Sequence, residues 1–407
     1  MIESPKPTLF GYGITTKAIA KALGGACTFF DDKVTKPYYD ENGNYILPSS
    51  LFDCDASSLE VTTPSLPPTH PLILSAKNLM SEYDYIFSTQ EKLPVNIWIS
   101  GTNGKTTTTQ MLTHLLEHKG ALSGGNIGTP LAELDINAPI WVLESSSYTL
   151  HHTHRASPNI YLLLPITPDH LDWHGTSQSY IEDKLKPLTT MREGELALIP
   201  KGLELPDTNA FVVEYDSIEF LEEYFDIDAT KINFRGAFLE DALLALAVTK
   251  VLFDEIDYSR INSFVIDAHR QEEFVDTLGR LWVNDSKATN IDATIQAIKG
   301  YAKSPIYLIL GGNDKGVDLD PLFEIMQGYT ITLYTIGTNS NRLLDLAQRY
   351  NIDALECKTL QKAINEIDKR LQIGDIALLS PAAASFDQFS SYKERGSLFM
   401  ELASKLS

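Results

Sequence analysis

Cysteine is scarce in this sequence, and long hydrophobic runs are absent from it. The only cysteines among the 407 residues are Cys27, Cys54 and Cys357, whose spacing is neither paired nor typical of a metal site. So few thiols argue against a disulfide framework and fit a reducing compartment. No stretch approaches about eighteen consecutive apolar residues, and no basic leader precedes an apolar run at the N-terminus. We therefore expect a soluble, cytoplasmic protein.

Positive charge is also in short supply. Lys and Arg total 33 against 54 Asp and Glu, which gives a formal net charge of −21. Such a field repels nucleic acids and anionic membrane surfaces, so an anionic ligand must meet local cations. Hydrophobic residues make up 43% and charged residues 21% of the chain, as in ordinary globular proteins. A chain of 407 residues exceeds what one hydrophobic core usually supports.

Short apolar runs, each followed by a turn and a helical pattern, predict α/β architecture with parallel sheets. The clearest runs are "VNIWIS", "IWVLE", "NIYLLLPIT", "LWVND", "PIYLILGG", "ITLYTIG" and "DIALLSPA". Polar segments at 88–94 and 267–274 place linkers near residues 91 and 267. We therefore predict three domains, covering residues 1–90, 91–266 and 267–407.

The stretch "WISGTNGKTTTTQML" joins one of these strands to a helical pattern. Gly101 and Gly104 are closer together than the glycines of the usual phosphate-binding loop, and Ile99 stands where the first glycine normally would. Backbone N–H groups at the start of a helix still favour an anion. Lys105 adds a cation, and Thr106 can place a hydroxyl on a Mg²⁺ ion.

Helical spacing of apolar residues after this loop predicts a helix over residues 104–119, with Gly120 as its stop. Later strands also end in polar residues: Glu144 closes one strand, and Asp169 and His170 follow another. Because ligands of parallel sheets bind beyond the carboxyl ends of the strands, we expect Glu144 and His170 to face the loop.

Two other features have ordinary structural explanations. The cluster "HHTHR" begins with His151 and His152, whose adjacent side chains point in different directions, so we expect exposed polar residues rather than a metal site. The segment "FGYGITT" resembles a nucleotide-binding turn, but Thr16 stands at the position of the third glycine. A plain tight turn is the alternative there.

In the C-terminal third, three strand ends carry polar groups. They are "VNDSKATN" with Asp285, Lys287 and Thr289, "LGGNDKGVD" with Lys315, and "SPAAASFDQFSSYKERG" with Ser385. Loops at one sheet edge that contribute two lysines and several hydroxyls suit a compact acid with two carboxylates.

Taken in order, the motifs resemble the Mur ligases of peptidoglycan synthesis. They are "GTNGKTTT", "SGGNIGTPL", "LESSSYTL", "TPDHLDWHG…YIEDK", "HRQE", "NDSKATN", "LGGNDKG" and "SPAAASFDQF", and the last three match best the branch that adds D-glutamate. The resemblance implies a Rossmann-like N-terminal domain, a central P-loop-type ATPase domain and a Rossmann-like C-terminal domain. It also implies ATP-dependent amide formation between UDP-N-acetylmuramoyl-L-alanine and D-glutamate through an acyl phosphate, by a monomer.

The resemblance also assigns roles to residues. For catalysis it points to Lys105, His170 and Lys184; for ATP to Gly101, Thr102, Asn103, Gly104, Lys105, Thr106, Thr107, Arg270 and Asp285; and for two Mg²⁺ sites to Thr106, Glu144, His170 and Lys184. For the substrates it points to Ile14, Thr15, Asn126, Ser146, Lys287, Thr289, Lys315, Ser385 and Tyr392, the last commonly Phe in the family. Lys184 matches a lysine that the family carbamylates, with Lys186 as the register alternative.

One segment departs from the family pattern. Where Mur ligases have asparagines that contribute to ATP contacts, "RGAFLEDALLALA" carries Phe238, Leu239 and Asp241. Three alternatives stay open: another Mur ligase or a ligase like folylpolyglutamate synthetase, a nucleotide-dependent switch, and a nicotinamide dehydrogenase. Lys315 and the "SPAAASFDQF" loop favour a Mur ligase over a ligase like folylpolyglutamate synthetase. A switch has no need of the polar pocket in the C-terminal domain.

Overall fold

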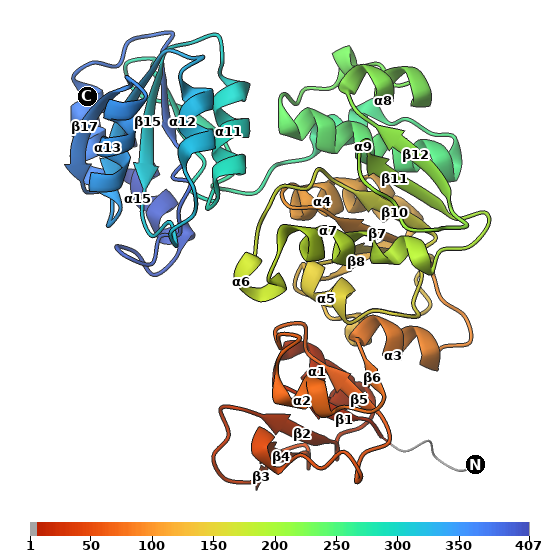
Figure 1. The fold of residues 1–407 in the computed structure, drawn as a ribbon. Helices are drawn as coiled ribbons and strands as arrows, with labels where there is room; N and C mark the ends of the chain where they lie inside the picture. Colours follow the sequence, from red (N-terminus) through yellow and green to blue (C-terminus); the bar gives the residue numbers. More distant parts are fainter. Residues whose placement is uncertain (1–5, 407) are drawn as a thin grey trace. The chain divides into compact units, whose positions relative to one another are not determined.

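The computed structural model describes residues 6–406 and contains three six-stranded sheets (Figure 1). The sheets are distributed over two compact units. The first comprises the chain up to Asn233 together with Glu240–Ser263, and the second comprises Phe234–Leu239 and Phe264–Ser407. The first two sheets lie in the first unit, and the third sheet lies in the second. The chain passes from sheet to sheet near the predicted linkers, and the three-domain boundaries stay a prediction.

The first sheet has the strand order β3-β4-β2-β1-β5-β6, parallel except for the β3–β4 pair. Its strands are β1 Thr8–Phe10, β2 Thr28–Asp31, β3 Tyr38–Tyr39, β4 Tyr45–Pro48, β5 Glu60–Thr62 and β6 Leu79–Met80; its helices are α1 Ile14–Ala22, α2 Pro71–Ser75 and α3 Glu82–Thr89. The turn before α1 lies at the carboxyl end of β1, as the "FGYGITT" pattern predicts.

The central sheet is parallel throughout, in the order β12-β11-β10-β7-β9-β8. Its strands are β7 Val95–Ser100, β8 Ala121–Gly125, β9 Ile140–Glu144, β10 Ile160–Leu163, β11 Leu196–Pro200 and β12 Phe211–Tyr215. Its helices are α4 Lys105–Leu116, α5 Ser147–His151, α6 Leu171–His174, α7 Ser177–Leu185, α8 Ile218–Phe225, α9 Ala237–Phe253 and α10 Tyr258–Ser263.

The expected helix after the loop is confirmed. Helix α4 begins at Lys105, a 3-10 turn extends it to Lys119, and Gly120 follows in the left-handed region with φ 81°. The run "NIYLLLPIT" is longer than its strand, since β10 ends at Leu163. Pro165 lacks the N–H that a longer ladder would need.

The third sheet has the order β13-β14-β18-β15-β16-β17, parallel except for the β13–β14 pair. Its strands are β13 Glu272–Val275, β14 Leu281–Asn284, β15 Ile306–Gly311, β16 Ile331–Ile336, β17 Asp353–Lys358 and β18 Ile376–Leu379. Helices α11 Ile291–Gly300, α12 Asp320–Met326 and α13 Ser340–Arg349 cover one face, and α14 Leu360–Asp368 and α15 Tyr392–Ser404 the other. The predicted α/β class is confirmed.

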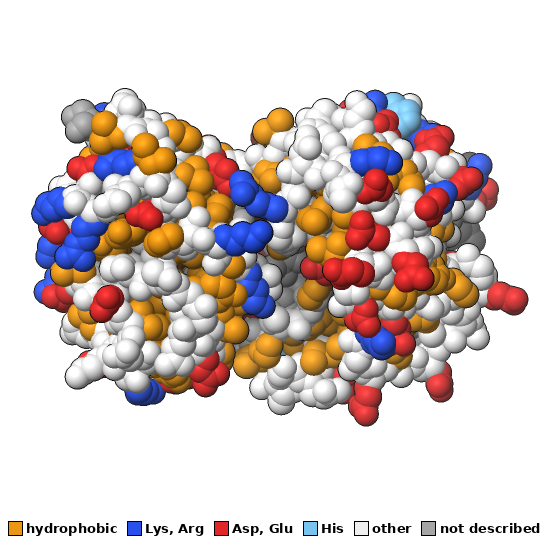
Figure 2. Space-filling view, turned by 90° about the horizontal axis from the view of Figure 1, so that it is seen from above, with side chains coloured by type: hydrophobic (Ala, Val, Ile, Leu, Met, Phe, Trp, Pro, Cys, Tyr) orange, Lys and Arg blue, Asp and Glu red, His pale blue; other side chains and the backbone are white. Residues whose placement is uncertain are grey.

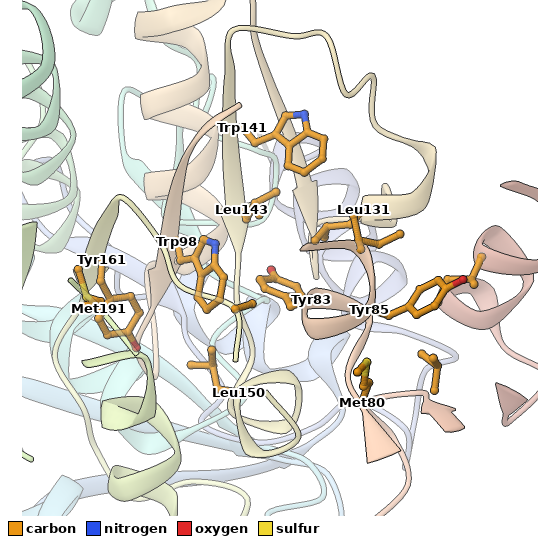
Figure 3. Close-up of a cluster of buried hydrophobic side chains, with 14 of the residues drawn as sticks. Met80, Tyr83, Tyr85, Trp98, Leu131, Trp141, Leu143, Leu150, Tyr161 and Met191 are labelled. Carbon is orange, nitrogen blue, oxygen red and sulfur yellow. The ribbon is translucent and has the colours of Figure 1, made fainter. Parts of the chain in front are cut away.

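A buried aromatic group joins α3 to the central sheet (Figure 3). The ring of Tyr83 lies edge-on to Trp98, with 4.7 Å between ring centroids. Beside it, the carboxylate of Asp84 accepts hydrogen bonds from the backbone N–H groups of His154, Arg155 and Ala156, each at 2.8 Å. These contacts fix α3 against Trp98 of β7 and against the chain before β10. No helix in the described part of the chain is long and apolar enough to cross a membrane.

Replacing Asp84 tests this anchor. The side chain of Asp84 is 2% exposed, and Asp84→Ala leaves the three backbone N–H groups that it binds without their acceptor. We therefore expect the free energy of unfolding of the first unit to fall by about 1–3 kcal/mol. Urea unfolding measures the loss, and Glu91→Ala, at an exposed carboxylate just after α3, is the control. An unchanged urea midpoint in Asp84→Ala would contradict the anchoring role.

Candidate active site

The loop between β7 and α4 is shaped by two glycines in unusual conformations. Gly101 has φ 139° and Gly104 has φ 82°, and a Cβ on Gly101 would lie 2.5 Å from the Cβ of Leu164. The Nζ of Lys105 folds back on the loop and donates to the carbonyls of Gly101 at 2.9 Å and Thr102 at 2.8 Å. A lysine so placed stands at the helix N-terminus, where an anion is favoured.

The other predicted nucleotide contacts of this loop differ in their burial and in their hydrogen bonds. The hydroxyl of Thr102 donates to the carbonyl of Thr167 at 2.9 Å, and Thr107 is 1% exposed with no partner for its Oγ1. Asn103 and Thr106 are only partly buried. Thr106 is therefore better placed than Thr107 to present a hydroxyl to a ligand.

Glu144 ends β9, the strand next to β7, and is 3% exposed. Its Oε1 accepts a hydrogen bond of 2.7 Å from the side-chain amide of Asn126, whereas Oε2 is buried and has no partner. A carboxylate oxygen that is buried without a donor is costly unless something binds it. Ser146, two residues further on, caps α5 by accepting the Thr149 N–H at 3.1 Å.

His170 lies beyond β10 in the left-handed region, with φ 54° and ψ 34°. Its backbone N–H donates to Asp169 Oδ1 at 2.8 Å, and its ring lies 5.0 Å from that of Tyr148. Burial lowers the pKa of His170, against the raising effect of Asp169, and the charges of Lys105 and Lys184 lower it further. The ring therefore favours the neutral form, which is the form that binds metal.

Lys184, on α7, is 1% exposed and reaches the same loop. Its Nζ donates to the Gly101 carbonyl at 2.8 Å and lies 3.3 Å from Ser100 Oγ and 4.7 Å from the centroid of the Tyr180 ring. Burial lowers the pKa of this amine well below its usual range, and Lys105 lowers it further. The register alternative, Lys186, instead donates to the carbonyl of His151. Of the two lysines, Lys184 is the one at the phosphate loop.

These groups fit a divalent cation. Among residues 6–406 no three His, Cys, Asp or Glu side chains converge on one point. Mg²⁺, however, is commonly held by one or two carboxylates together with phosphate oxygens and water. The unpartnered oxygen of Glu144 meets that need at the edge where the loop lies.

The departure at "RGAFLEDALLALA" has a structural role that the sequence did not reveal. Asp241, on α9, is 6% exposed, and its Oδ1 accepts the hydroxyl of Thr108 on α4 at 2.9 Å. Phe238 and Leu239 are partly buried. An acidic residue at this position therefore braces the helix that follows the phosphate loop.

The expectation of exposed polar residues at "HHTHR" is wrong for its first two histidines. His152 is 3% exposed and faces the carbonyl of Leu66 at 3.2 Å. His151 is only partly exposed, and its Nδ1 lies 2.9 Å from both oxygens of Asp183. That carboxylate was missed because no local pattern marks a partner more than thirty residues away.

In the second unit, Lys287 and Tyr392 lie together, with the Lys287 Nζ 4.2 Å from the centroid of the Tyr392 ring. Asp285, 6% exposed, accepts hydrogen bonds from Ser380 Oγ at 2.8 Å and the Gln271 N–H at 3.2 Å. Of the remaining predicted contacts, Thr289 and Lys315 are exposed, Arg270 is partly buried and Ser385 is 2% exposed.

A cavity of about 570 Å³ opens in the first sheet at the carboxyl ends of β1 and β2. Gly11, Gly13, Asp31, Lys33 and Lys36 are among its lining residues. Ile14 and Thr15 begin α1 next to this lining and are not part of it; Ile14 is 76% exposed.

On the face drawn in Figure 2, groups of lysine and arginine side chains stand apart from the acidic ones, so local cations exist despite the net charge.

A parallel central sheet together with two further α/β sheets is the fold found in solved structures of Mur ligases. The family model for the Mur ligase middle domain matches residues 99–206. The solved structure of MurF ligase from Thermotoga maritima in complex with ADP has the same fold, with a TM-score of 0.56 at 15% identity over 86% of this chain and 88% of that chain.

Within that class, the chain belongs to the UDP-N-acetylmuramoylalanine–D-glutamate ligase family. The ligase of that name from Campylobacter jejuni subsp. jejuni serotype O:23/36 (strain 81-176) is 49% identical over 404 residues, covering 98% of this chain and 100% of that protein. The one from Helicobacter pylori (strain ATCC 700392 / 26695) is 47% identical over 414 residues, covering 97% and 98%.

The buried carboxyl of Asp285 makes the stability of the second unit depend on pH. Burial raises its pKa to about 7 from 3.8, so the folded state holds a proton that the unfolded state releases between those values. Its contribution to stability is therefore complete below about pH 4 and is lost as pH rises to about 7. We expect Asp285→Asn to flatten this decline.

Urea midpoints at several pH values, read from hydrogen exchange of β14 and β18, measure the effect. The control is Asp353→Asn, at an exposed carboxyl on the same sheet. A pH dependence in Asp285→Asn as steep as in the unchanged protein would contradict this assignment.

Proposed function

We propose that this protein is an ATP-dependent ligase that joins D-glutamate to UDP-N-acetylmuramoyl-L-alanine in peptidoglycan precursor synthesis. The observation that carries the proposal is 49% identity to a ligase of that name over 98% of the chain. The phosphate loop with two lysines at its carbonyls supports it independently. We also propose that it works as a cytoplasmic monomer.

The reaction proceeds in two displacements. A carboxylate oxygen of the alanyl substrate attacks the γ-phosphorus of ATP, and ADP leaves. The amine of D-glutamate then attacks the acyl carbon, loses a proton, and phosphate leaves as the amide forms. Both steps bring anions together, so positioning and charge neutralisation dominate the catalysis.

The chain supplies these needs from the first unit. Lys105 stands at the start of α4 to meet the phosphates, and the backbone N–H groups of the loop orient them. Thr106, Glu144, His170 and a carbamylated Lys184 would hold Mg²⁺. When bound, Mg²⁺ would neutralise phosphate charge during transfer.

The burial of Lys184 supports the proposal that this lysine is carbamylated. A neutral amine attacks CO₂ at carbon and releases a proton, and the resulting carbamate is an anion suited to a cation site. The lowered pKa of Lys184 favours that neutral amine.

Each part of the substrates is proposed to bind a different region of the fold. The cavity of the first sheet would take the uridine diphosphate near Ile14 and Thr15, and Asn126 and Ser146 would meet the muramoyl part. In the second unit, Arg270 and Asp285 would approach the nucleotide. Lys287, Thr289, Lys315, Ser385 and Tyr392 would surround D-glutamate, whose two carboxylates suit the lysines.

The decisive experiment follows phosphate release from ATP and Mg²⁺ with UDP-N-acetylmuramoyl-L-alanine. D-glutamate, L-glutamate or no amino acid is added in parallel reactions. We expect release that requires both the muramoyl substrate and D-glutamate. Release indifferent to both would instead support a nucleotide-dependent switch, and release with another amino acid would support a different ligase.

The role of Lys184 has a direct spectroscopic test. With ¹³C-bicarbonate, we expect a carbamate carbon signal in the unchanged protein and in Lys186→Arg, and none in Lys184→Arg. Because Lys184→Arg keeps the positive charge but cannot form the anion, its kcat should fall by about 10²- to 10³-fold. A carbamate signal that disappears in Lys186→Arg instead would reverse the assignment.

A further inference from the structure

A chain of buried hydrogen bonds runs between three helices of the first unit. Asp183 Oδ2, on α7, lies 2.8 Å from His174 Nδ1, at the end of α6. On the other side of the ring, His174 Nε2 lies 2.9 Å from Ser147 Oγ, the first residue of α5. A carboxylate accepts, so His174 Nδ1 carries the proton, and a neutral ring then accepts at Nε2 from the serine hydroxyl. Every link of the chain has a consistent donor and acceptor.

The hydrogen-bond chain is shielded from solvent, and two aromatic rings lie beside its histidine. Ser147 is 3% exposed, the His174 side chain 0% and Asp183 8%. The rings of Tyr148 and Trp173 lie 5.6 Å and 4.5 Å from His174. Buried polar groups that are fully paired hold one geometry, because breaking any link leaves a neighbour unsatisfied.

The order serine, histidine, aspartate is also that of a hydrolase triad. A hydrolase needs its serine open to a substrate carbonyl. Here Ser147 and His174 are enclosed, and the aromatic rings of Tyr148 and Trp173 lie against the histidine. The burial favours a structural use of the chain over a nucleophilic one.

The three members of the chain share their segments with the candidate cation ligands. Ser147 follows Glu144 by three residues, at the turn from β9 into α5. His174 and His170 bound the same short helix, α6. Asp183 directly precedes Lys184 on α7. A second contact joins two of these segments, because His151 Nδ1, at the end of α5, lies 2.9 Å from both oxygens of Asp183.

We propose that the Ser147–His174–Asp183 chain consists of positioning residues for the divalent-cation site of the ligase. The inference rests on the proposed function. Groups that orient metal ligands through hydrogen bonds typically change metal affinity by 10- to 100-fold when they are removed. The chain acts in the same sense here, because it fixes the backbone from which each candidate ligand projects.

The test is Mn²⁺ binding to the full-length protein in the presence of ADP, followed by electron paramagnetic resonance. We expect Asp183→Asn, which keeps the shape and removes the charge, to raise the Kd for Mn²⁺ by about 10- to 100-fold. The matched control is Glu182→Gln, the exposed neighbour on α7, which removes the same charge and should leave the Kd unchanged. In phosphate release, Asp183→Asn should need more Mg²⁺ and recover its rate at saturating Mg²⁺.

Ser147→Ala is the second variant, at the other end of the chain, and it decides the question if Asp183→Asn fails to fold. We expect it to weaken Mn²⁺ binding in the same direction. Folded variants that bind Mn²⁺ as tightly as Glu182→Gln would overturn the inference. Failure of the proposed function looks different, because the unchanged protein would then release no phosphate in response to D-glutamate.

Discussion

The hydrogen bond from the buried Lys184 amine to the Gly101 carbonyl is the contact on which the organisation of the site depends. An ammonium group without solvent is costly. The protein offsets that cost with the Gly101 carbonyl and the Ser100 hydroxyl as acceptors, and with a pKa of Lys184 that is shifted toward the neutral form. The contact ties α7 to the loop of β7. Because Tyr180 of α7 also lies 3.1 Å from the Thr102 hydroxyl, loop and helix hold one another at two points.

Around this contact the fold holds groups of both charge signs, with the lysine amines on loop carbonyls and the Glu144 carboxylate on the Asn126 amide. The unpartnered oxygen of Glu144 and the lysines at the loop all lie at one edge of a parallel sheet. In a chain with a net charge of −21, that local arrangement matters more than the total. A polyphosphate with its cation brings charges of both signs and so complements both kinds of group.

The parallel strands and the loop between β7 and α4 were predictable from the sequence, for physical reasons. The strands of the parallel sheets are continuous apolar runs, and the phosphate loop is a local motif, so both appear in short windows. The partners of Asp183 and Asp241 lie far away in the sequence, and only the folded chain brings them together. The burial of His152 escaped notice for the same reason. Short strands such as β3 and β6 carry too few residues to show a period.

Gly101 and Gly125 lie at positions where the surrounding structure leaves no room for a side chain. A Cβ at Gly125 would lie 2.5 Å from the Glu144 carbonyl oxygen, and one at Gly101 would collide with Leu164. Both collisions involve atoms of the neighbouring strand ends, which cannot retreat without moving the sheet edge itself. In a saturation library these two positions should return glycine alone, while the exposed residues around them drift.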